Sequence, residues 1–176
     1  APTGSAVVDA VYALPLQFPN GESVDVEAVA VLPDASAILL FEKTATPQTN
    51  DGARIFAARA PWTLAADEDS APALLEQMGT VDMGAGDDDV ITGAAVHWSG
   101  TRLLLRTATK IVEFEGASPA AFLDLSSSEP RLELPSPERE GQRGEAVSYD
   151  EAGVDVVSVA EAAAGEVPVL HRSACP

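Results

Sequence analysis

Short runs of apolar residues, rich in Val, Ile, Leu and Phe, alternate along the chain with turns rich in Pro, Gly, Asp and Ser. The runs lack the 3.6-residue spacing of a helix, so they predict short β-strands and an all-β fold. The twelve predicted strands are Val7–Phe18, Glu27–Leu32, Ile38–Lys43, Arg54–Arg59, Ala73–Val81, Ile91–Trp98, Arg102–Thr107, Lys110–Glu115, Arg131–Leu134, Glu145–Tyr149, Val154–Ala160 and Val167–Arg172.

Three segments of the chain repeat one pattern. Each opens with a polar residue, continues as an apolar strand, turns, and returns as a second strand that ends in a charged residue. The opening and closing residues are Glu27 and Lys43, Thr92 and Arg106, and Glu145 and Glu161, separated by 16, 14 and 16 positions. A third strand follows each pair. Because such sheets bury both faces only against neighbouring copies, the repeat predicts a β-propeller of four-stranded antiparallel blades.

The predicted blades cover approximately residues 24–85, 90–137 and 143–176, and residues 5–20 form an outer strand of a preceding or closing blade. The segments 65–70 with 84–89, and 116–130, are polar insertions that we expect to be surface loops. A β-sandwich is the rival architecture, but it does not require the charge-terminated strand to recur in register.

Three blades are fewer than the usual four to eight, so the chain is predicted to be part of a larger propeller. The last repeat also lacks a fourth strand. Either Val7–Phe18 closes it, or a second chain supplies both this strand and the missing blades. We favour the second chain, because so few blades leave a wide wedge open.

The repeat openings resemble those of exported bacterial β-propellers related to the lipoprotein and phytase-like propellers. The matching residues are Asp25-Val26-Glu27-Ala28, Glu42-Lys43, Ile91-Thr92-Gly93, Arg106-Thr107 and Gly144-Glu145-Ala146. The resemblance runs from Tyr12 to Leu170 and covers the C-terminal half of such proteins. Two features depart from it: the family's S-P-D-G turn is Trp98-Ser99-Gly100-Thr101 here, and Ala108 replaces an aromatic residue. The resemblance implies an extracellular, periplasmic or cell-surface location.

Composition excludes several classes of function. The 176 residues include 28 Asp and Glu but only 10 Lys and Arg, a formal net charge of −18, which repels phosphate backbones and disfavours nucleic-acid binding. No apolar run is long enough to span a bilayer. The chain begins at Ala1 without a signal-peptide pattern, which agrees with removal of a signal or with an internal cleavage. The single cysteine, Cys175, forms either a disulfide with another chain or a free thiol.

Six polar residues are candidates for a ligand-binding site. Antiparallel pairing places the start of each first strand beside the end of the second, so Glu27, Lys43, Thr92, Arg106, Glu145 and Glu161 should meet at one mouth of the central channel. A purely structural network, with Glu27 bound to Lys43 and Arg106 reaching Glu145 or Glu161, is one interpretation. The other is a binding site. Phytase-like propellers hold Ca²⁺ with carboxylates at this face, so the resemblance implies Glu27, Glu145 and Glu161 as metal ligands.

The sequence gives little support for a zinc site, for nucleophilic catalysis or for a phosphate-binding loop. Two histidines, His97 and His171, and one cysteine do not make a zinc site, and no nucleophile elbow or phosphate-binding glycine loop is present. His97 is expected to be a packed core residue. The acidic runs Asp67-Glu68-Asp69 and Asp87-Asp88-Asp89, the latter with Asp82, are interpreted as solvated loops.

These observations favour a non-enzymatic exported binding or assembly module with its site at the channel mouth, although catalysis stays open. The alternatives are a Ca²⁺-dependent phosphoester hydrolase of the phytase-like type, in which Lys43 and Arg106 draw phosphate, and a purely structural subunit of a surface assembly.

Overall fold

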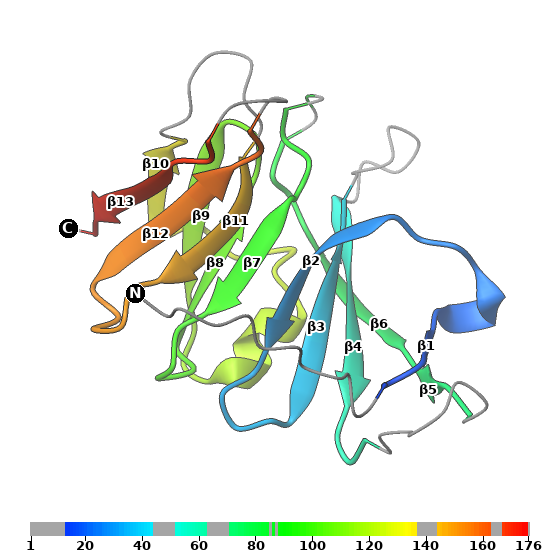
Figure 1. The fold of residues 1–176 in the computed structure, drawn as a ribbon. Helices are drawn as coiled ribbons and strands as arrows, with labels where there is room; N and C mark the ends of the chain where they lie inside the picture. Colours follow the sequence, from blue (N-terminus) through cyan, green and yellow to red (C-terminus); the bar gives the residue numbers. More distant parts are fainter. Residues whose placement is uncertain are drawn as a thin grey trace, which may run out of the picture.

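A computed structural model describes residues 13–43, 52–62, 71–84, 86, 88–136, 144–162 and 167–175. The fold is all-β, as predicted, and the described residues contain no α-helix. Three antiparallel sheets are arranged as successive propeller blades, and a fourth, two-stranded parallel sheet lies beside them (Figure 1). Among the described residues, no helix meets the length and apolarity needed to cross a membrane.

Blade 1 is a four-stranded sheet in the order β2-β3-β4-β6, and blade 2 is a four-stranded sheet in the order β7-β8-β9-β10. Blade 3 has three described strands, β11-β12-β13. The strand bounds are β2 Val26–Val31, β3 Ala37–Glu42, β4 Ala53–Arg59, β6 Glu76–Val81, β7 Gly93–Val96, β8 Arg102–Arg106, β9 Lys110–Glu115, β10 Leu132–Pro135, β11 Gly144–Tyr149, β12 Asp155–Ala160 and β13 Leu170–Ala174.

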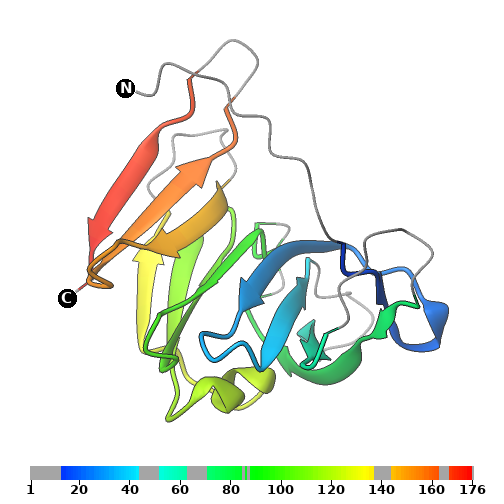
Figure 2. The ribbon, with the colours of Figure 1, turned by 60° about the horizontal axis from the view of Figure 1, so that its bottom comes forward.

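The first strands of the three blades, β2, β7 and β11, lie side by side in sequence order (Figures 1 and 2). This is the radial arrangement of a propeller, in which each blade contributes its first strand to the central channel. A sandwich would instead stack two sheets face to face. The sandwich alternative is therefore wrong.

The turns between the first and second strands repeat as closely as the strands do. Ala35, Gly100 and Gly153 each have a positive φ, and each donates its N–H to the carbonyl three residues earlier. Glycine tolerates this backbone conformation without steric cost, so Gly100 and Gly153 suit the turn better than Ala35 does. The match shows that one turn geometry closes the hairpin in all three blades.

The N-terminal segment differs from the expectation for Val7–Phe18. Residues 1–12 lie outside the described residues, and Leu16–Gln17 (β1) pairs in parallel with Ala73–Leu74 (β5) beside blade 1. Pro15 and Pro19 flank β1 and limit its length, because proline cannot donate to a ladder. A short 3₁₀ turn, Pro19–Gly21 (η1), follows. Nothing in the described part of this segment pairs with blade 3.

Two further predicted strands have different bounds in the structure. Ala73–Val81 is divided at Leu75, whose N–H donates to the carbonyl of Gln17 rather than to blade 1. Val167–Arg172 starts too early, because β13 takes its register from Leu170 opposite Val159. Alternation along a single strand shows which residues share a face, and it does not fix where pairing begins.

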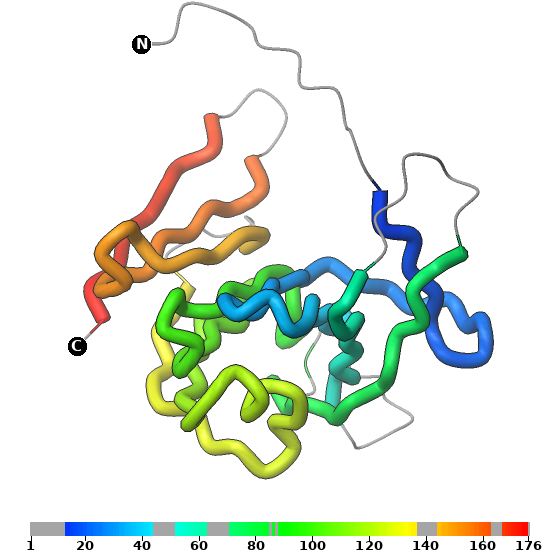
Figure 3. The backbone as a smooth tube through the Cα atoms, turned by 90° about the horizontal axis from the view of Figure 1, so that it is seen from below, coloured from blue at the N-terminus to red at the C-terminus, as the bar shows by residue number. Residues whose placement is uncertain are grey.

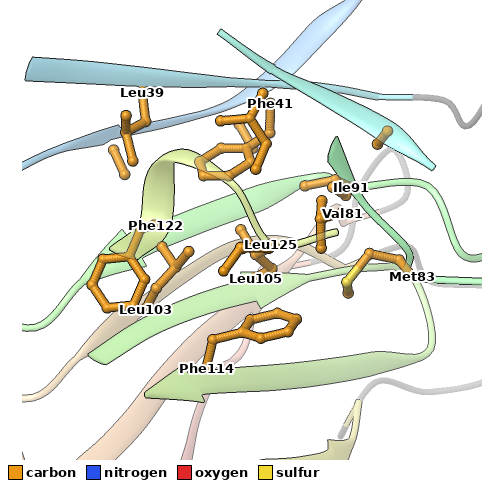
Figure 4. Packing of buried hydrophobic residues seen from close by; sticks show 14 of the residues in the cluster. Leu39, Phe41, Val81, Met83, Ile91, Leu103, Leu105, Phe114, Phe122 and Leu125 are labelled. Atoms are coloured by element: carbon orange, nitrogen blue, oxygen red, sulfur yellow. The ribbon is translucent and has the colours of Figure 1, made fainter. Parts of the chain in front are cut away.

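The largest core cluster lies between blades 1 and 2 (Figure 4). Leu39, Phe41 and Ile55 from blade 1 pack against Leu103 and Leu105 of blade 2. Full burial of side chains of this size contributes about 1.5–3 kcal/mol each. This interface is the main hydrophobic core of the described residues.

The insertion 116–130 is not simply a surface loop, which corrects the sequence-based expectation. It contains a 3₁₀ helix, Pro119–Leu123 (η2), whose Phe122 is fully buried in the core between blades 1 and 2. Leu125 also joins this cluster, and its N–H donates to the carbonyl of Thr80 on β6. The insertion therefore contributes side chains to the core, where Phe122 lies beside Leu103 and Leu125 beside Leu105 (Figure 4). Residues 65–70 of the other insertion lie outside the described part of the chain.

Cys175 packs beside a smaller cluster between blades 2 and 3, formed by Leu104, Ile111, Val147 and Val156. Burial raises the pKa of its thiol. A raised thiol pKa lowers the thiolate fraction and slows disulfide exchange. These surroundings suit a packing contact better than a bridge to another chain.

Candidate functional site

The first strands β2, β7 and β11 start at one end of the propeller, and the second strands β3, β8 and β12 end there. This follows from the antiparallel pairing of Val26 with Glu42, Gly93 with Arg106, and Gly144 with Ala160. The polar residues that open and close the repeats are thereby brought to one mouth of the channel, as the spacing predicted.

A pocket of about 150 Å³ lies at this mouth. Its lining residues come from all three blades, from the β6–β7 connection between blades 1 and 2, and from the β8–β9 loop: Glu27, Lys43, Asp88, Val90, Thr92, Ala108, Glu145 and Glu161. Five of the six predicted site residues line the pocket, and Arg106 does not. Four carboxylates and one ammonium group give the pocket a net negative charge.

Lys43 and Glu27 form an ion pair in the pocket, with 2.5 Å between Nζ and Oε1. The hydrogen bond that Lys43 donates to Glu27 is the main cause of the raised Lys43 pKa, and the charges of Asp25 and Glu145 add to it. The backbone of Lys43 also joins two blades, because its carbonyl accepts the N–H of Ile91 at 3.0 Å. The predicted Glu27–Lys43 pairing is confirmed.

Thr92 is buried and connects blade 2 to blade 3. Its Oγ1 donates to the carbonyl of Gly144 at 2.5 Å, and its own N–H donates to the carbonyl of Arg106 at 2.9 Å. The Thr92 side chain therefore holds the first strands of two blades together at the edge of the pocket.

Arg106 is fully buried and does not line the pocket. Its Nη1 donates to the carbonyl of Ala146 at 2.9 Å and its Nη2 donates to Oγ of Ser136 at 3.0 Å. A Cβ at Gly144 would overlap the guanidinium, so glycine makes room for it. Desolvation lowers the pKa of Arg106 to about 10, which leaves the group cationic at neutral pH. The guanidinium thus supplies positive charge without forming a wall of the pocket.

The surroundings of Glu145 raise the pKa of its carboxyl group. Burial is the largest cause of its raised pKa, and the charges of Glu27 and Glu161 raise it further. Lys43 and Arg106 lower it, but they do not cancel the other effects. The pocket therefore holds more negative charge than its own cations neutralise, and a bound cation would relieve the repulsion.

The raised Glu145 pKa predicts a pH-dependent gain in stability for Glu145→Gln. A carboxylate whose pKa is higher in the folded protein costs stability at neutral pH, and the cost disappears as the pH falls through that raised pKa. At pH 7 we expect the free energy of unfolding of the variant to exceed that of the wild type by about 0.5 kcal/mol. This is the size of a repulsion between like charges that is partly screened by solvent.

Urea unfolding measured from pH 7 down to pH 4 tests this expectation. The difference from the wild type should shrink as the pH falls through the raised pKa and be lost below about 4.5, the ordinary pKa of a glutamate. Glu151→Gln, an exposed carboxylate in the β11–β12 turn, is the control and should show no such pH-dependent gain. A Glu145→Gln variant that is less stable at pH 7 would contradict the repulsion.

The three carboxylates that the family resemblance implies as metal ligands all line the pocket. Glu27, Glu145 and Glu161 share the pocket, and Glu27 directs one oxygen to Lys43. Across the described residues, no three His, Cys, Asp or Glu side chains are arranged to hold a metal ion. In the nearby acidic loop, Asp82 accepts the N–H of Gly84, and Asp89 pairs with Lys110 at 3.3 Å.

Asp88, Val90 and Ala108 line the pocket but were not predicted to belong to the site. Asp88 lies in the acidic run that the sequence presents as a solvated loop, and its closeness in the chain to the predicted site residue Thr92 was the available signal. Ala108 follows Arg106-Thr107 in the loop between β8 and β9. Its small side chain leaves the pocket open on that side.

His97, the expected core residue, is indeed buried, and it lies among the turns at the end of its blade away from the pocket. Its ring contacts those of Trp98 and Tyr149, with centroids 5.0 and 4.9 Å apart. Its Nδ1 accepts the N–H of Ser99 at 3.1 Å. Burial lowers the pKa of His97, which fits a neutral packing residue.

No protein-family model matches the sequence, and no curated protein matches it. Solved structures of similar fold include hydrazine synthase of Kuenenia stuttgartiensis, with a TM-score of 0.50 and 10% identity over 84% of this chain. The structure of U3-55K matches 88% of the chain at 10% identity with a TM-score of 0.37. The chain spans 33% of the hydrazine synthase chain and 55% of the U3-55K chain. Both have β-propeller-type folds, and the hydrazine synthase match supports a β-propeller fold for this chain.

Proposed function

We propose that this chain is a binding module of an exported β-propeller and that its channel-mouth pocket holds a cationic group, an ammonium or a guanidinium, of its ligand. The observation that carries the proposal is the gathering of Glu27, Asp88, Glu145 and Glu161 around one pocket that contains a single lysine. A ligand cation would pair with carboxylates that now repel one another.

The pocket has further features that suit an organic cation. Thr92 and Lys43 fix its walls through bonds between blades, so the carboxylates are held before the ligand arrives. Val90 and Ala108 supply apolar surface beside the carboxylates, where the methylene groups of an amine ligand would pack.

Phosphoester hydrolysis is less well supported by the same pocket. Lys43 is paired with Glu27, and Arg106 donates to Ala146 and Ser136. A phosphate entering here would face four carboxylates and a single ammonium group, which already pairs with Glu27. The charge distribution thus favours a ligand of the opposite sign.

Isothermal calorimetry with 1,4-diaminobutane and with N-acetyl-arginine amide tests the proposal. Because charged hydrogen bonds contribute about 1.5–3 kcal/mol, Glu161→Gln should weaken binding about tenfold or more. Glu151→Gln, outside the pocket, should bind as the wild type does.

Calcium chloride and inorganic phosphate are titrated in parallel. Binding of calcium or phosphate without binding of either amine would overturn the proposal. So would amine binding that Glu161→Gln leaves unchanged.

We also propose that the chain acts in an assembly, because its three blades need neighbours on both sides to close a propeller. The partner would be a further chain that supplies blades and completes the channel mouth.

A further inference from the structure

His97 lies at the junction between blades 2 and 3, at the end of the molecule away from the pocket. Figure 3 views the molecule from this end and shows the β11–β12 turn of blade 3 beside the β7–β8 turn of blade 2. The buried His97 ring occupies the space between the two turns, because a Cβ at Gly153 would overlap its Nε2. The Tyr149 ring at the end of β11 meets the imidazole edge to face, at an angle of 84°. The imidazole is therefore one of the contacts that hold blade 3 on blade 2.

The hydrogen bonds of His97 determine which ring nitrogen carries the proton. Nδ1 accepts the N–H of Ser99 at 3.1 Å, and the Ser99 hydroxyl lies 2.6 Å from the same nitrogen. The proton of the neutral ring is therefore on Nε2, which is buried against the backbone of Gly153. A second proton would have to bind Nδ1, where it would face the N–H of Ser99. Uptake of a proton thus replaces a hydrogen bond with repulsion between two donors.

The charged and titratable groups that face the ring disfavour its cationic form. They are Arg102 of β8, Glu113 of β9 and the Tyr149 hydroxyl of β11. Burial is the largest reason that the pKa of His97 is lowered, and the charge of Arg102 lowers it further. The charge of Glu113 raises this pKa, but it does not cancel the other two effects. An imidazolium would therefore be poorly accommodated in the junction.

The nearby carboxylates already have other partners. Glu113 accepts hydrogen bonds from two arginines and from the Tyr149 hydroxyl. Asp150, in the β11–β12 turn that covers the ring, binds the Arg172 guanidinium at 2.7 Å and accepts the N–H of Val154 at 2.9 Å. A proton on the imidazole would thus bring a positive charge into the junction without a new counter-ion to pair with it.

We propose that His97 makes the junction between blades 2 and 3 sensitive to acid: the blades stay packed while the imidazole is neutral, and blade 3 loosens when the ring takes up a proton. The unfolded chain binds this proton more readily than the folded chain does. The stability that His97 contributes is therefore present above pH 6.5, the ordinary pKa of histidine, and is lost as the pH falls from there through the lowered pKa of the folded protein.

β11 connects this junction to the pocket. The strand carries Glu145 near its start, where it lines the pocket, and Tyr149 at its end, where it contacts His97. Loosening of blade 3 would therefore also loosen one wall of the pocket.

Urea unfolding from pH 7.5 to pH 5.5 compares the wild type with two variants that do not titrate at this position. His97→Phe keeps an aromatic ring between the turns, and His97→Asn keeps an oxygen that can accept the N–H of Ser99. Over this range the unfolding equilibrium constant of the wild type should rise about 5- to 10-fold relative to that of either variant, the equivalent of one lost hydrogen bond. His171→Asn removes the other histidine of the chain, on β13, and should keep the wild-type dependence on pH.

Hydrogen–deuterium exchange locates the part of the chain that loosens. The wild type and His97→Phe are compared at the same pH, so that the intrinsic exchange rate of each amide cancels. At pH 5.5 the amides of β11 and β12 should exchange about 5- to 10-fold faster in the wild type, relative to the ratio at pH 7.5. The amides of β2 and β3 in blade 1 should show no such excess.

Equal pH dependence of unfolding in the wild type and in both His97 variants would overturn the proposal. So would an excess of exchange at pH 5.5 that is spread evenly over blades 1 and 3. Circular dichroism shows whether each variant is folded, and if one is not, the other carries the comparison. Neither measurement involves a ligand, so the result is independent of the cation site proposed above.

Discussion

Replacing Glu113 by alanine is expected to lower the free energy of unfolding by about 3–5 kcal/mol, the cost of removing one partner from a buried ionic network. Glu113 lies on β9 and its side chain is fully buried between blades 2 and 3. It accepts hydrogen bonds from Arg131, from Arg102 at 3.5 Å and from the Tyr149 hydroxyl at 2.9 Å.

The large loss of stability is expected because Glu113→Ala leaves its three hydrogen-bond donors without their acceptor. Without Glu113, Arg102 and Arg131 face each other across a site that blade 3 covers, and the Tyr149 hydroxyl loses its acceptor. Arg102 also stacks on the Tyr149 ring, 5.1 Å from its centroid, and donates to the carbonyl of Gly153 at 2.7 Å. Loss of Glu113 thus loosens the junction between two blades.

Urea unfolding of Glu113→Ala measures the loss, and Glu115→Ala is the control. Glu115 lies two residues away on the same strand and binds the same Arg131 at 3.3 Å, but its side chain is 64% exposed. An exposed ion pair contributes about 0–1 kcal/mol, so the control should change little. If both variants lost the same amount, burial would not be the cause.

The sequence predicted which residues meet at the pocket better than it predicted the contacts between neighbouring blades. Recurrence of Glu27, Thr92 and Glu145 at the starts of first strands was enough to bring them together, because antiparallel geometry does the rest. The same reasoning placed Arg106 in the pocket, and the structure places it below Gly144. Alternation shows which face of a strand a residue occupies, and it does not show that a neighbouring blade covers an arginine.

Glu113 was hidden from sequence analysis for a similar reason. It alternates with Val112 and Phe114 as a solvent-facing charge would, and only the arrival of Tyr149 from blade 3 makes its site buried. Contacts of this kind join residues far apart in the chain. They depend on the packing of whole blades rather than on any local pattern.

The insertion 116–130 is a case in which a segment that the sequence presents as a surface loop contributes to the core. Its composition is that of a polar loop, and the five residues of η2 are too few for a helical period to be recognised. Phe122 nevertheless fills the space between blades 1 and 2 beside Leu103, as Figure 4 shows. Without the insertion, the end of this core would be open to water.

Replacing Phe122 by alanine is therefore expected to lower the free energy of unfolding by about 3–5 kcal/mol, as for other buried phenylalanines. The fully buried ring has no other side chain to replace it, and a cavity would form at the base of the blade 1–blade 2 junction. Trp98→Ala removes a larger ring that is 70% exposed, and it should cost under about 1 kcal/mol.

Comparison of the two variants by urea unfolding decides whether the insertion is part of the core. A loss at Phe122 several times the loss at Trp98 would mean that the propeller depends on this segment for stability. Equal, small losses would mean that the blades hold together without it, and that η2 only rests against a junction already closed by Leu39, Phe41 and Leu105. The burial of Phe122 and its contacts with both blades favour the first result, because a ring excluded from water on all sides has no other environment in the folded chain.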